Sequence, residues 1–223
     1  MQDNLQTIYA QRFSGREEYR RKVWGVLVAD YLYRFMPAEA SVLDLGCGYG
    51  EFINQVKAPV RYGMDLNPDA RQCLHPDVRL FQQDCSVRWP LPDDTLDLVF
   101  TSNFFEHLPS KSSLAATLHE ARRCLRPGRR LVCLGPNIKY LPGAYWDFWD
   151  HYLPLTEASL AEGLQMVGFK LERVVPRFLP YTMADGPRYP LFLFRVYLRW
   201  PFAWRLFGRN SSSLLRSEFT YES

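Results

Sequence analysis

The sequence predicts an α/β fold in which a mostly parallel central sheet is flanked by helices. Short apolar segments of strand composition alternate with helix-like segments between residues 41 and 175. Such alternation is typical of parallel sheets, because the helices that join successive strands cover both faces of the sheet. The length of 223 residues and the hydrophobic share of 47% fit one domain with a real core, or one domain with an extension.

The first half of the pattern begins with a helix and continues with four strands. Residues 16–36 place apolar side chains close to helical spacing, and Pro37 ends this helix. We expect another helix to begin within 50–57, and the pair Asn67-Pro68 to begin a further one. The expected strands are 41–45, 60–66, 78–84 and 95–102, with a turn-rich loop at 86–94.

The second half adds two helices and two strands. Arg126-Pro127-Gly128 ends the first of these helices, whereas Thr156 is expected to cap the start of the second and Gly168 to close it. The helices are expected at 110–125 and 157–167, the strands at 129–137 and 169–175, and a long loop containing Pro and Trp at 138–155.

The end of the chain does not continue the alternation. We divide the chain into a domain over 1–175, with the N-terminal helix as a lid, and an appendage over 176–223. Residues 212–221 are a candidate for a final strand. From residue 186 to residue 217 there are six arginines and no acid, among many aromatic and leucine side chains. This composition is typical of a helix that lies on an anionic membrane, and a lid over the acceptor site or a dimer contact is the alternative.

Composition and charge argue against several functional classes. The net charge of +3 is too small for a protein dedicated to wrapping nucleic acid. The five cysteines form no CxxC pair, which favours a reduced, cytoplasmic setting, with contact at the inner membrane surface as a further hypothesis. Neither a signal peptide nor a membrane-spanning helix is expected, and the histidines show no spacing typical of a metal site.

One glycine-rich turn carries the strongest signal. The buried strand in VLDLGCGYG (42–50) leads into glycines at 46, 48 and 50. Glu51 stands where a GxGxxG dinucleotide fingerprint needs its third glycine, and no P-loop is present. Asp44, Asp65 and Asp84 follow three successive strands at their ends. Because ligands of open α/β sheets bind beyond the carboxyl ends of the strands, these carboxylates predict a site for an amino group, a ribose and an adenine.

These segments together resemble the class I S-adenosylmethionine-dependent methyltransferases. The resemblance covers about residues 40–175, and the matching stretches are VLDLGCGYG, GMDLNPD, QQDC, LPDDTLDLVFTSNFFEHL, LRPGRRLVCLGPN and DHYLPLTEASLAEGLQMVGF. It implies a Rossmann-like methyltransferase fold and S-adenosylmethionine as cofactor. The residues that it implies for cofactor binding are Asp44, Gly46, Cys47, Gly48, Gly50, Asp65 for the ribose diol, Leu66, Asp84 and Cys85 for the adenine, and Asn103 near the methionine part.

Methyl transfer to a hydroxyl group needs a base, because the hydroxyl must lose its proton. His107, which follows the fourth expected strand, and His151, in the loop after the fifth, are the candidates for this catalytic role. The structural alternative for His107 is a packing histidine at a helix start. Positioning alone accelerates methyl transfer, so no metal ion is expected.

A second, less specific resemblance concerns the acceptor. SNFFEHL, PNIKYLPGAYWDFWDHYLPLT, FLPYT and the tail are similar to bacterial methyltransferases associated with cell-surface glycan or glycolipid building. It implies O-methylation of a small-molecule or lipid-linked sugar acceptor. A C- or N-methyltransferase of another metabolite, a non-catalytic scaffold that binds the cofactor, and an NAD-dependent oxidoreductase stay as alternatives. A homodimer and peripheral membrane contact through 186–217 are the further partners considered.

Overall fold

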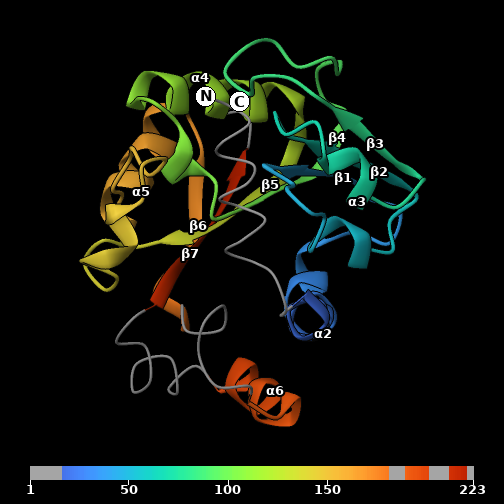
Figure 1. Cartoon of the computed structure of the whole chain (residues 1–223). Coiled ribbons are helices and arrows are strands. Elements are labelled where there is room, and N and C mark those ends of the chain that lie inside the picture. The colour runs from blue at the N-terminus through green and yellow to red at the C-terminus, as the bar shows by residue number, and fades with distance from the viewer. Residues whose placement is uncertain (1–16, 181–188, 201–210, 220–223) are drawn as a thin grey trace.

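The computed structural model describes residues 17–180, 189–200 and 211–219. Seven strands form one sheet in the order β3-β2-β1-β4-β5-β7-β6, with helices on both faces (Figure 1). Neighbouring strands run parallel from β3 to β5, and β7 is antiparallel to both β5 and β6. The predicted α/β fold is confirmed. The chain reverses its direction of winding between β1 and β4, and ligands of open α/β sheets bind at such a point.

The elements have the following bounds. The strands are β1 (Ser41–Leu45), β2 (Val60–Met64), β3 (Val78–Phe81), β4 (Leu96–Ser102), β5 (Leu125–Pro136), β6 (Lys170–Pro180) and β7 (Ser211–Phe219). The helices are α2 (Glu17–Asp30), α3 (Ala70–Cys73), α4 (Lys111–Cys124), α5 (Glu157–Met166) and α6 (Leu191–Arg199). Short 3-10 turns are η1 (Leu32–Phe35), η2 (Ile53–Gln55), η3 (Phe105–His107) and η4 (Ala144–Asp147).

The alternation of side chains along the central strands builds two cores, one on each face of the sheet. Leu43 of β1 and Val99 of β4 belong to the core under α4 and α5. Their neighbours Val42 and Phe100 belong to the opposite core, under α2 and α6. Figure 1 shows the same division, with α4 and α5 on one side of the sheet and α2 and α6 on the other. Both faces are therefore buried, which explains why the strands read as almost continuous apolar runs.

Two helices expected near the cofactor side are shorter than a sequence pattern suggests. Residues 50–57 form turns and the 3-10 turn η2, and α3 is a single turn. Val56 and Leu74 are already extended at the ends of these pieces. Pro59 and Pro76 follow closely, and a proline disfavours helical backbone before it. The connections from β1 to β2 and from β2 to β3 are therefore compact loops.

The end of the chain contributes to the sheet. β6 continues through Pro180, and β7 lies between β5 and β6 with both of them as partners. The candidate final strand at 212–221 is thus confirmed as β7, within the stretch 176–223. The same stretch supplies α6, which packs beside α2. None of the helices within the described ranges is long and apolar enough to cross a membrane.

Candidate cofactor and acceptor site

The glycine turn lies at the carboxyl end of β1. Gly46, Gly48 and Gly50 all adopt positive φ angles, of 72°, 48° and 76°. A Cβ at Gly46 would lie 2.2 Å from the Phe104 ring, and one at Gly50 would lie 2.6 Å from Asn54 Nδ2. A Cβ at Gly48 would meet nothing within 4 Å. The packing of the protein itself thus requires two of the glycines, whereas the backbone of Gly48 borders open space.

Asp65 holds this turn against the end of β2. Its Oδ2 accepts a hydrogen bond from the Gly48 N–H at 2.7 Å, and its Oδ1 accepts one from the Asn67 N–H at 2.8 Å. Since Asp65 is the first residue after β2, its carboxylate lies beside the open side of Gly48. The next residue, Leu66, has 58% of its surface exposed, although it is a large apolar side chain. Asp65 therefore contacts the glycine turn directly, whereas the Leu66 side chain faces solvent.

Asp44 and Cys47 are enclosed in the protein. Asp44 is buried within β1, and burial, together with the charge of Glu51, raises the pKa of its carboxyl group. Burial also raises the pKa of the Cys47 thiol, whose sulfur packs against Gly63. The side chain of Cys47 therefore faces the core, and its backbone is the part that lies in the turn.

Asp84 and Cys85 lie in the loop after β3, at the side of the predicted adenine. Asp84 is exposed, and its Oδ1 accepts hydrogen bonds from the Ser86 N–H at 2.8 Å and hydroxyl at 2.7 Å. Cys85 points the other way, with its sulfur 3.2 Å from Thr117 Oγ1, and burial raises the pKa of this thiol to about 11. Asp84 thus borders solvent, whereas the Cys85 side chain packs on α4.

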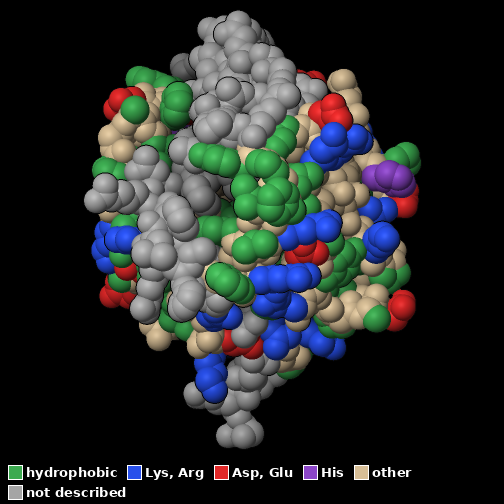
Figure 2. All heavy atoms as spheres, turned by 90° about the horizontal axis from the view of Figure 1, so that it is seen from below, with side chains coloured by type: hydrophobic (Ala, Val, Ile, Leu, Met, Phe, Trp, Pro, Cys, Tyr) green, Lys and Arg blue, Asp and Glu red, His purple; other side chains and the backbone are tan. Residues whose placement is uncertain are grey.

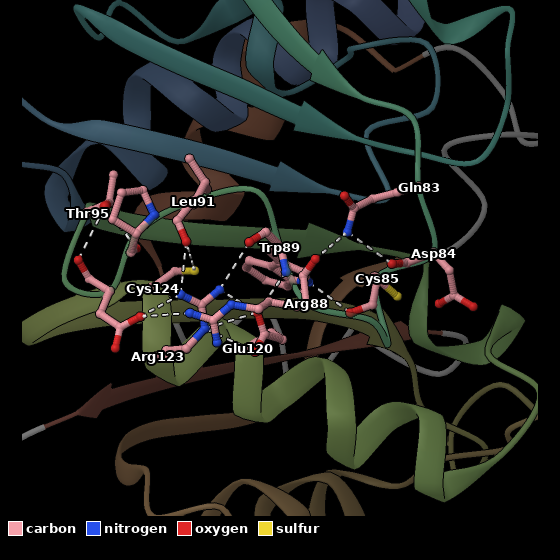
Figure 3. A network of polar contacts seen from close by, with 12 residues as sticks. Gln83, Asp84, Cys85, Arg88, Trp89, Leu91, Thr95, Glu120, Arg123 and Cys124 are labelled. Carbon is pink, nitrogen blue, oxygen red and sulfur yellow. Dashed lines mark hydrogen bonds and ion pairs between the residues drawn. The ribbon is translucent and has the colours of Figure 1, made fainter.

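A polar network fixes this loop on α4 (Figure 3). The Trp89 indole N–H donates to the Cys85 carbonyl at 2.8 Å, and the Trp89 amide donates to Glu120 Oε2 at 2.8 Å. Arg123 donates to the Leu91 carbonyl at 2.9 Å and also pairs with Glu120. Glu120 and Arg123 of α4, which are far from this loop in sequence but contact it in space, therefore hold the loop beside Asp84 in position.

The residues after β4 close the site on its other side. Asn103 adopts a φ of 47°, and its amide donates to the Leu134 carbonyl at 2.9 Å. Asn103 is exposed, whereas the next side chain, Phe104, packs against Gly46. Phe105 is buried in the core. The chain therefore turns sharply at the carboxyl end of β4 and brings the segment 103–107 next to the glycine turn.

The chemistry of this edge fits S-adenosylmethionine. An exposed backbone at Gly48 lets a ligand approach closely, and the Asp65 carboxylate provides acceptors suited to a ribose diol. Asp84 supplies an exposed carboxylate further along the same edge. Apart from Asp44, which lies within β1, the expected cofactor residues therefore lie on the loops that follow β1, β2, β3 and β4 at one edge of the sheet.

A cluster of histidines and acids forms where η3 meets the loop 138–155. His107 Nδ1 lies 3.2 Å from Asp150 Oδ2 and 3.0 Å from the Asp150 carbonyl oxygen. His151 Nδ1 lies 2.7 Å from the Tyr145 carbonyl oxygen, and the two imidazole centroids are 4.8 Å apart. The pKa of His107 is raised above the ordinary histidine value. Burial by itself would lower it, but the hydrogen bond to Asp150 and the negative charges of Glu106 and Asp150 have the larger effect. The two expected histidines thus form one cluster, although 44 positions separate them.

Glu106 is a buried residue of η3 that hydrogen-bonds the loop carrying Asp150 and His151. Its side chain has only 2% of its surface exposed, and its Oε1 accepts a hydrogen bond from the Tyr145 hydroxyl at 2.6 Å. Burial raises the pKa of Glu106. Its backbone carbonyl accepts from the amides of Tyr152 and Leu153, at 2.7 and 3.1 Å. These contacts tie the long loop 138–155 to η3 and so bring His151 to His107.

A small cavity lies next to this cluster, at the carboxyl ends of β4 and β5. Its walls include Glu106 and Thr101, together with apolar side chains of α5 and of the loop before it. The Thr101 hydroxyl is buried and has no hydrogen-bond partner among the described residues. The cavity thus places the polar groups of Glu106 and Thr101 beside apolar walls.

Tertiary structure reveals partners that the sequence analysis missed. Asp150 is adjacent to His151 in sequence, but its carboxylate pairs with His107. Tyr145 and Glu106 are linked across 39 positions. An acidic residue beside a histidine gave a local signal for Asp150, but nothing in the sequence indicated its partner. His107, Asp150 and His151 also offer ligand atoms within 4.8 Å of one another, a set that could hold a cation.

Comparison with known proteins defines the family of this chain. A family model described as a methyltransferase domain matches residues 16–174. The chain belongs to this methyltransferase family. Its cofactor is S-adenosylmethionine, as the resemblance implied, and the alternative of an NAD-dependent oxidoreductase is wrong.

Curated relatives of this methyltransferase share part of its length. It is 29% identical over 154 residues to a probable S-adenosylmethionine-dependent methyltransferase of Mycolicibacterium smegmatis, covering 66% of this chain and 59% of that protein. It is 28% identical over 164 residues to a demethylmenaquinone methyltransferase of Lactiplantibacillus plantarum, covering 66% and 67%. The chain spans 59% of the length of the Mycolicibacterium protein, and 47% and 54% of the lengths of two further curated relatives.

Solved structures share the fold. An S-adenosylmethionine-dependent methyltransferase of Archaeoglobus fulgidus superposes with a TM-score of 0.68 at 21% identity, covering 95% of this chain and 98% of that one. A methyltransferase solved in complex with the Trm112 activator of Haloferax volcanii gives 0.69 at 19% identity, with coverages of 95% and 97%. The Rossmann-like class I methyltransferase fold expected from the resemblance is therefore confirmed.

Proposed function

We propose that this methyltransferase transfers a methyl group from S-adenosylmethionine to a hydroxyl of a small-molecule or lipid-linked acceptor, with His107 as the general base. The observation that carries this proposal is the His107–Asp150 pair at the acceptor side of the glycine turn. Only three positions separate His107 from Phe104, which contacts Gly46. A histidine oriented by a buried carboxylate suits the removal of a hydroxyl proton.

The residues divide the work between the two halves of the site. The bound cofactor supplies a methyl carbon that is activated by a positively charged sulfur. Gly48 and Asp65 would hold the donor, and the segment 103–107 would position the acceptor hydroxyl beside it. The transfer would form a bond from that oxygen to the methyl carbon as the carbon–sulfur bond breaks, with the electron pair of that bond left on sulfur. His107 takes the hydroxyl proton, and Asp150 stabilises the imidazolium that results.

The formation of S-adenosylhomocysteine tests the activity. We expect the protein to produce it with a panel of sugar and lipid-linked hydroxyl acceptors, and NMR of the product to show an O-methyl group. His107→Ala should lower turnover at least about a hundredfold if His107 is the base, while leaving cofactor affinity unchanged. His119→Ala removes a histidine outside the cluster and serves as the matched control. Unchanged turnover of His107→Ala would remove the base from the mechanism.

C-methylation of a quinone-like acceptor is the second candidate function. The names of several relatives support it, because they are demethylmenaquinone and 2-methyl-6-phytyl-1,4-hydroquinone methyltransferases. Such an acceptor also carries a hydroxyl or carbonyl group, so the same panel should include hydroquinones. A carbon-bound methyl signal in the product would favour this candidate. Cofactor binding without S-adenosylhomocysteine formation in any cell extract would instead favour the non-catalytic scaffold.

We further propose that the N-terminal helix covers the cofactor, as a lid at the glycine turn. The support is an ion pair between Arg20 of α2 and Glu51, which directly follows Gly50. Trp24 of α2 contacts Phe100 edge to face, with ring centroids 6.1 Å apart. Arg20→Gln should therefore weaken cofactor affinity more than Arg21→Gln, since Arg21 is an exposed arginine on the same helix.

A further inference from the structure

The solvent-facing side of α6 is apolar, although α6 already buries its other side. Leu198 is buried, and Leu191 and Phe194 pack against the core beneath α2. The opposite side is formed by large apolar residues at helical spacing, and each exposes nearly half of its surface or more: Tyr189 54%, Phe192 64%, Leu193 46%, Val196 48% and Trp200 63%. A helix that is apolar on both sides is normally covered on both sides.

Positive charge lies along the flank of this apolar surface. Arg195 and Arg199 are four residues apart and so stand on one side of α6, between its buried and its exposed apolar faces. Arg195 also pairs with Asp30 of α2 at 3.2 Å, which fixes the helix in this orientation. Within the ranges that the structure describes, no carboxylate forms an ion pair with Arg199. Figure 2 shows the apolar patch facing the viewer, with Lys and Arg side chains beside it.

The placement of α6 is well defined by polar contacts at both of its ends. The Tyr19 hydroxyl of α2 lies 3.1 Å from both the Tyr189 amide nitrogen and its carbonyl oxygen. The Tyr197 hydroxyl donates to the Phe178 carbonyl of β6 at 2.6 Å. The apolar surface is therefore presented outward by a helix that is attached to α2 and to the sheet.

We propose that this surface, formed by Tyr189, Phe192, Leu193, Val196 and Trp200 with Arg199 at its flank, docks on an anionic lipid bilayer. A short helix with bulky apolar residues on one side and arginines at its flank lies in the interface of such a bilayer, with its apolar side among the acyl chains. Tyr and Trp at the ends of the patch prefer the headgroup region. The sequence that follows α6 has the same composition, because residues 201–210 contain two arginines, several aromatic residues and no acid.

Vesicle flotation tests this docking with point variants of the full chain. Deleting 186–223 is unsuitable, because it removes β7 from between β5 and β6. The double variant Phe192→Ser/Val196→Ser should lower binding to vesicles of phosphatidylcholine and phosphatidylglycerol by at least about tenfold. Arg199→Gln should lower it by about fivefold and reduce its dependence on salt. Pure phosphatidylcholine vesicles should bind the wild-type protein more weakly.

Two control variants at exposed residues outside α6, and a separate measurement of folding, accompany this experiment. Met166→Ser changes an apolar residue of α5 that is 82% exposed, and Arg88→Gln changes an arginine whose side chain is 73% exposed; both should float like the wild type. Calorimetry with S-adenosylmethionine should give equal affinity for all variants and so report their folding. Equal flotation of wild type and double variant would overturn the proposal. A dimer that the double variant converts to a monomer, without vesicle binding, would overturn it in favour of a contact between two copies.

The docking is independent of the methyl acceptor. A protein that floats but forms no S-adenosylhomocysteine would refute the proposed activity alone, and an active protein that does not float would refute the docking alone.

Discussion

At the scale of single residues, Asp65 links the glycine turn to the end of β2. Its carboxylate accepts two backbone hydrogen bonds, and a bound ribose would compete for or extend them. We expect Asp65→Ala to weaken S-adenosylmethionine binding by about tenfold to a hundredfold, since hydrogen bonds to a charged group contribute about 1.5–3 kcal/mol. Isothermal calorimetry measures this change. Asp69→Ala, at an exposed acid of the same loop, is the control, and an unchanged affinity for Asp65→Ala would contradict the assignment.

The pairing of His107 with Asp150 predicts a pH dependence. Burial lowers the pKa of His107, but Asp150 and Glu106 raise it above the ordinary histidine value. Because only the neutral imidazole accepts a proton, kcat/KM should rise with pH through this raised pKa. Asp150→Asn removes the carboxylate whose hydrogen bond contributes most to this rise, so the acid limb of the profile should move to lower pH.

The control for this profile is Asp147→Asn, an exposed acid three residues earlier in the same loop. Its acid limb should coincide with that of the wild type. A fixed acid limb in Asp150→Asn would show that the group being titrated is another one.

At the scale of elements, the start of α5 depends on Thr156. Its hydroxyl accepts from the Ser159 amide at 3.0 Å, and the Ser159 hydroxyl accepts from the Thr156 amide at 2.9 Å. Thr156→Ala should lower the free energy of unfolding by about 1 kcal/mol, because one helical N–H loses its acceptor. Thr156→Ser retains the hydroxyl and should lose much less. Urea denaturation compares the two variants, and equal stabilities would contradict the role of the cap.

The loop between β3 and β4 depends on Arg123 of α4. This guanidinium bonds the Leu91 and Trp89 carbonyls at 2.9 and 3.2 Å and pairs with Asp93 and Glu120. Arg123→Ala leaves these acceptors without their donor, so the free energy of unfolding should fall by about 2 kcal/mol.

Urea denaturation measures this loss as well. Arg88→Ala, at an exposed surface pair, should change stability by less than about 0.5 kcal/mol. If Arg123→Ala lowers the free energy of unfolding no more than Arg88→Ala does, the bonds of Arg123 do not stabilise the loop.

At the scale of the whole molecule, the end of the chain completes the sheet. β7 pairs with β5 on one side and β6 on the other, and Leu214 and Leu215 enter the two opposite cores. Deletion of residues 211–223 should therefore prevent cooperative folding, because β6 loses its strand partner. Deletion of 220–223, which leaves every described strand in place, is the control. Circular dichroism during heating distinguishes the two, and a cooperative transition in the longer deletion would contradict this role.

The sequence by itself determined the order and type of the elements that build the cofactor edge. An apolar run that ends in glycines or in an acid is a local pattern. Such patterns were enough to predict β1, the glycine turn after it, and the carboxylates of Asp65 and Asp84 after the next two strands. The cap at Thr156 follows for the same reason. Short helices were less predictable, because Pro59 follows η2 and Pro76 follows α3, and a local start signal such as Asn67-Pro68 does not show how soon a helix ends.

Only the tertiary structure decided the contacts between distant segments. His107 meets Asp150 and His151 because Glu106 anchors the loop 138–155, and such long-range pairs leave no periodic signal. The insertion of β7 between β5 and β6 and the outward apolar side of α6 likewise depend on what packs beside each element. A sequence states which side chains are apolar, but burial is decided by the neighbours that the fold supplies.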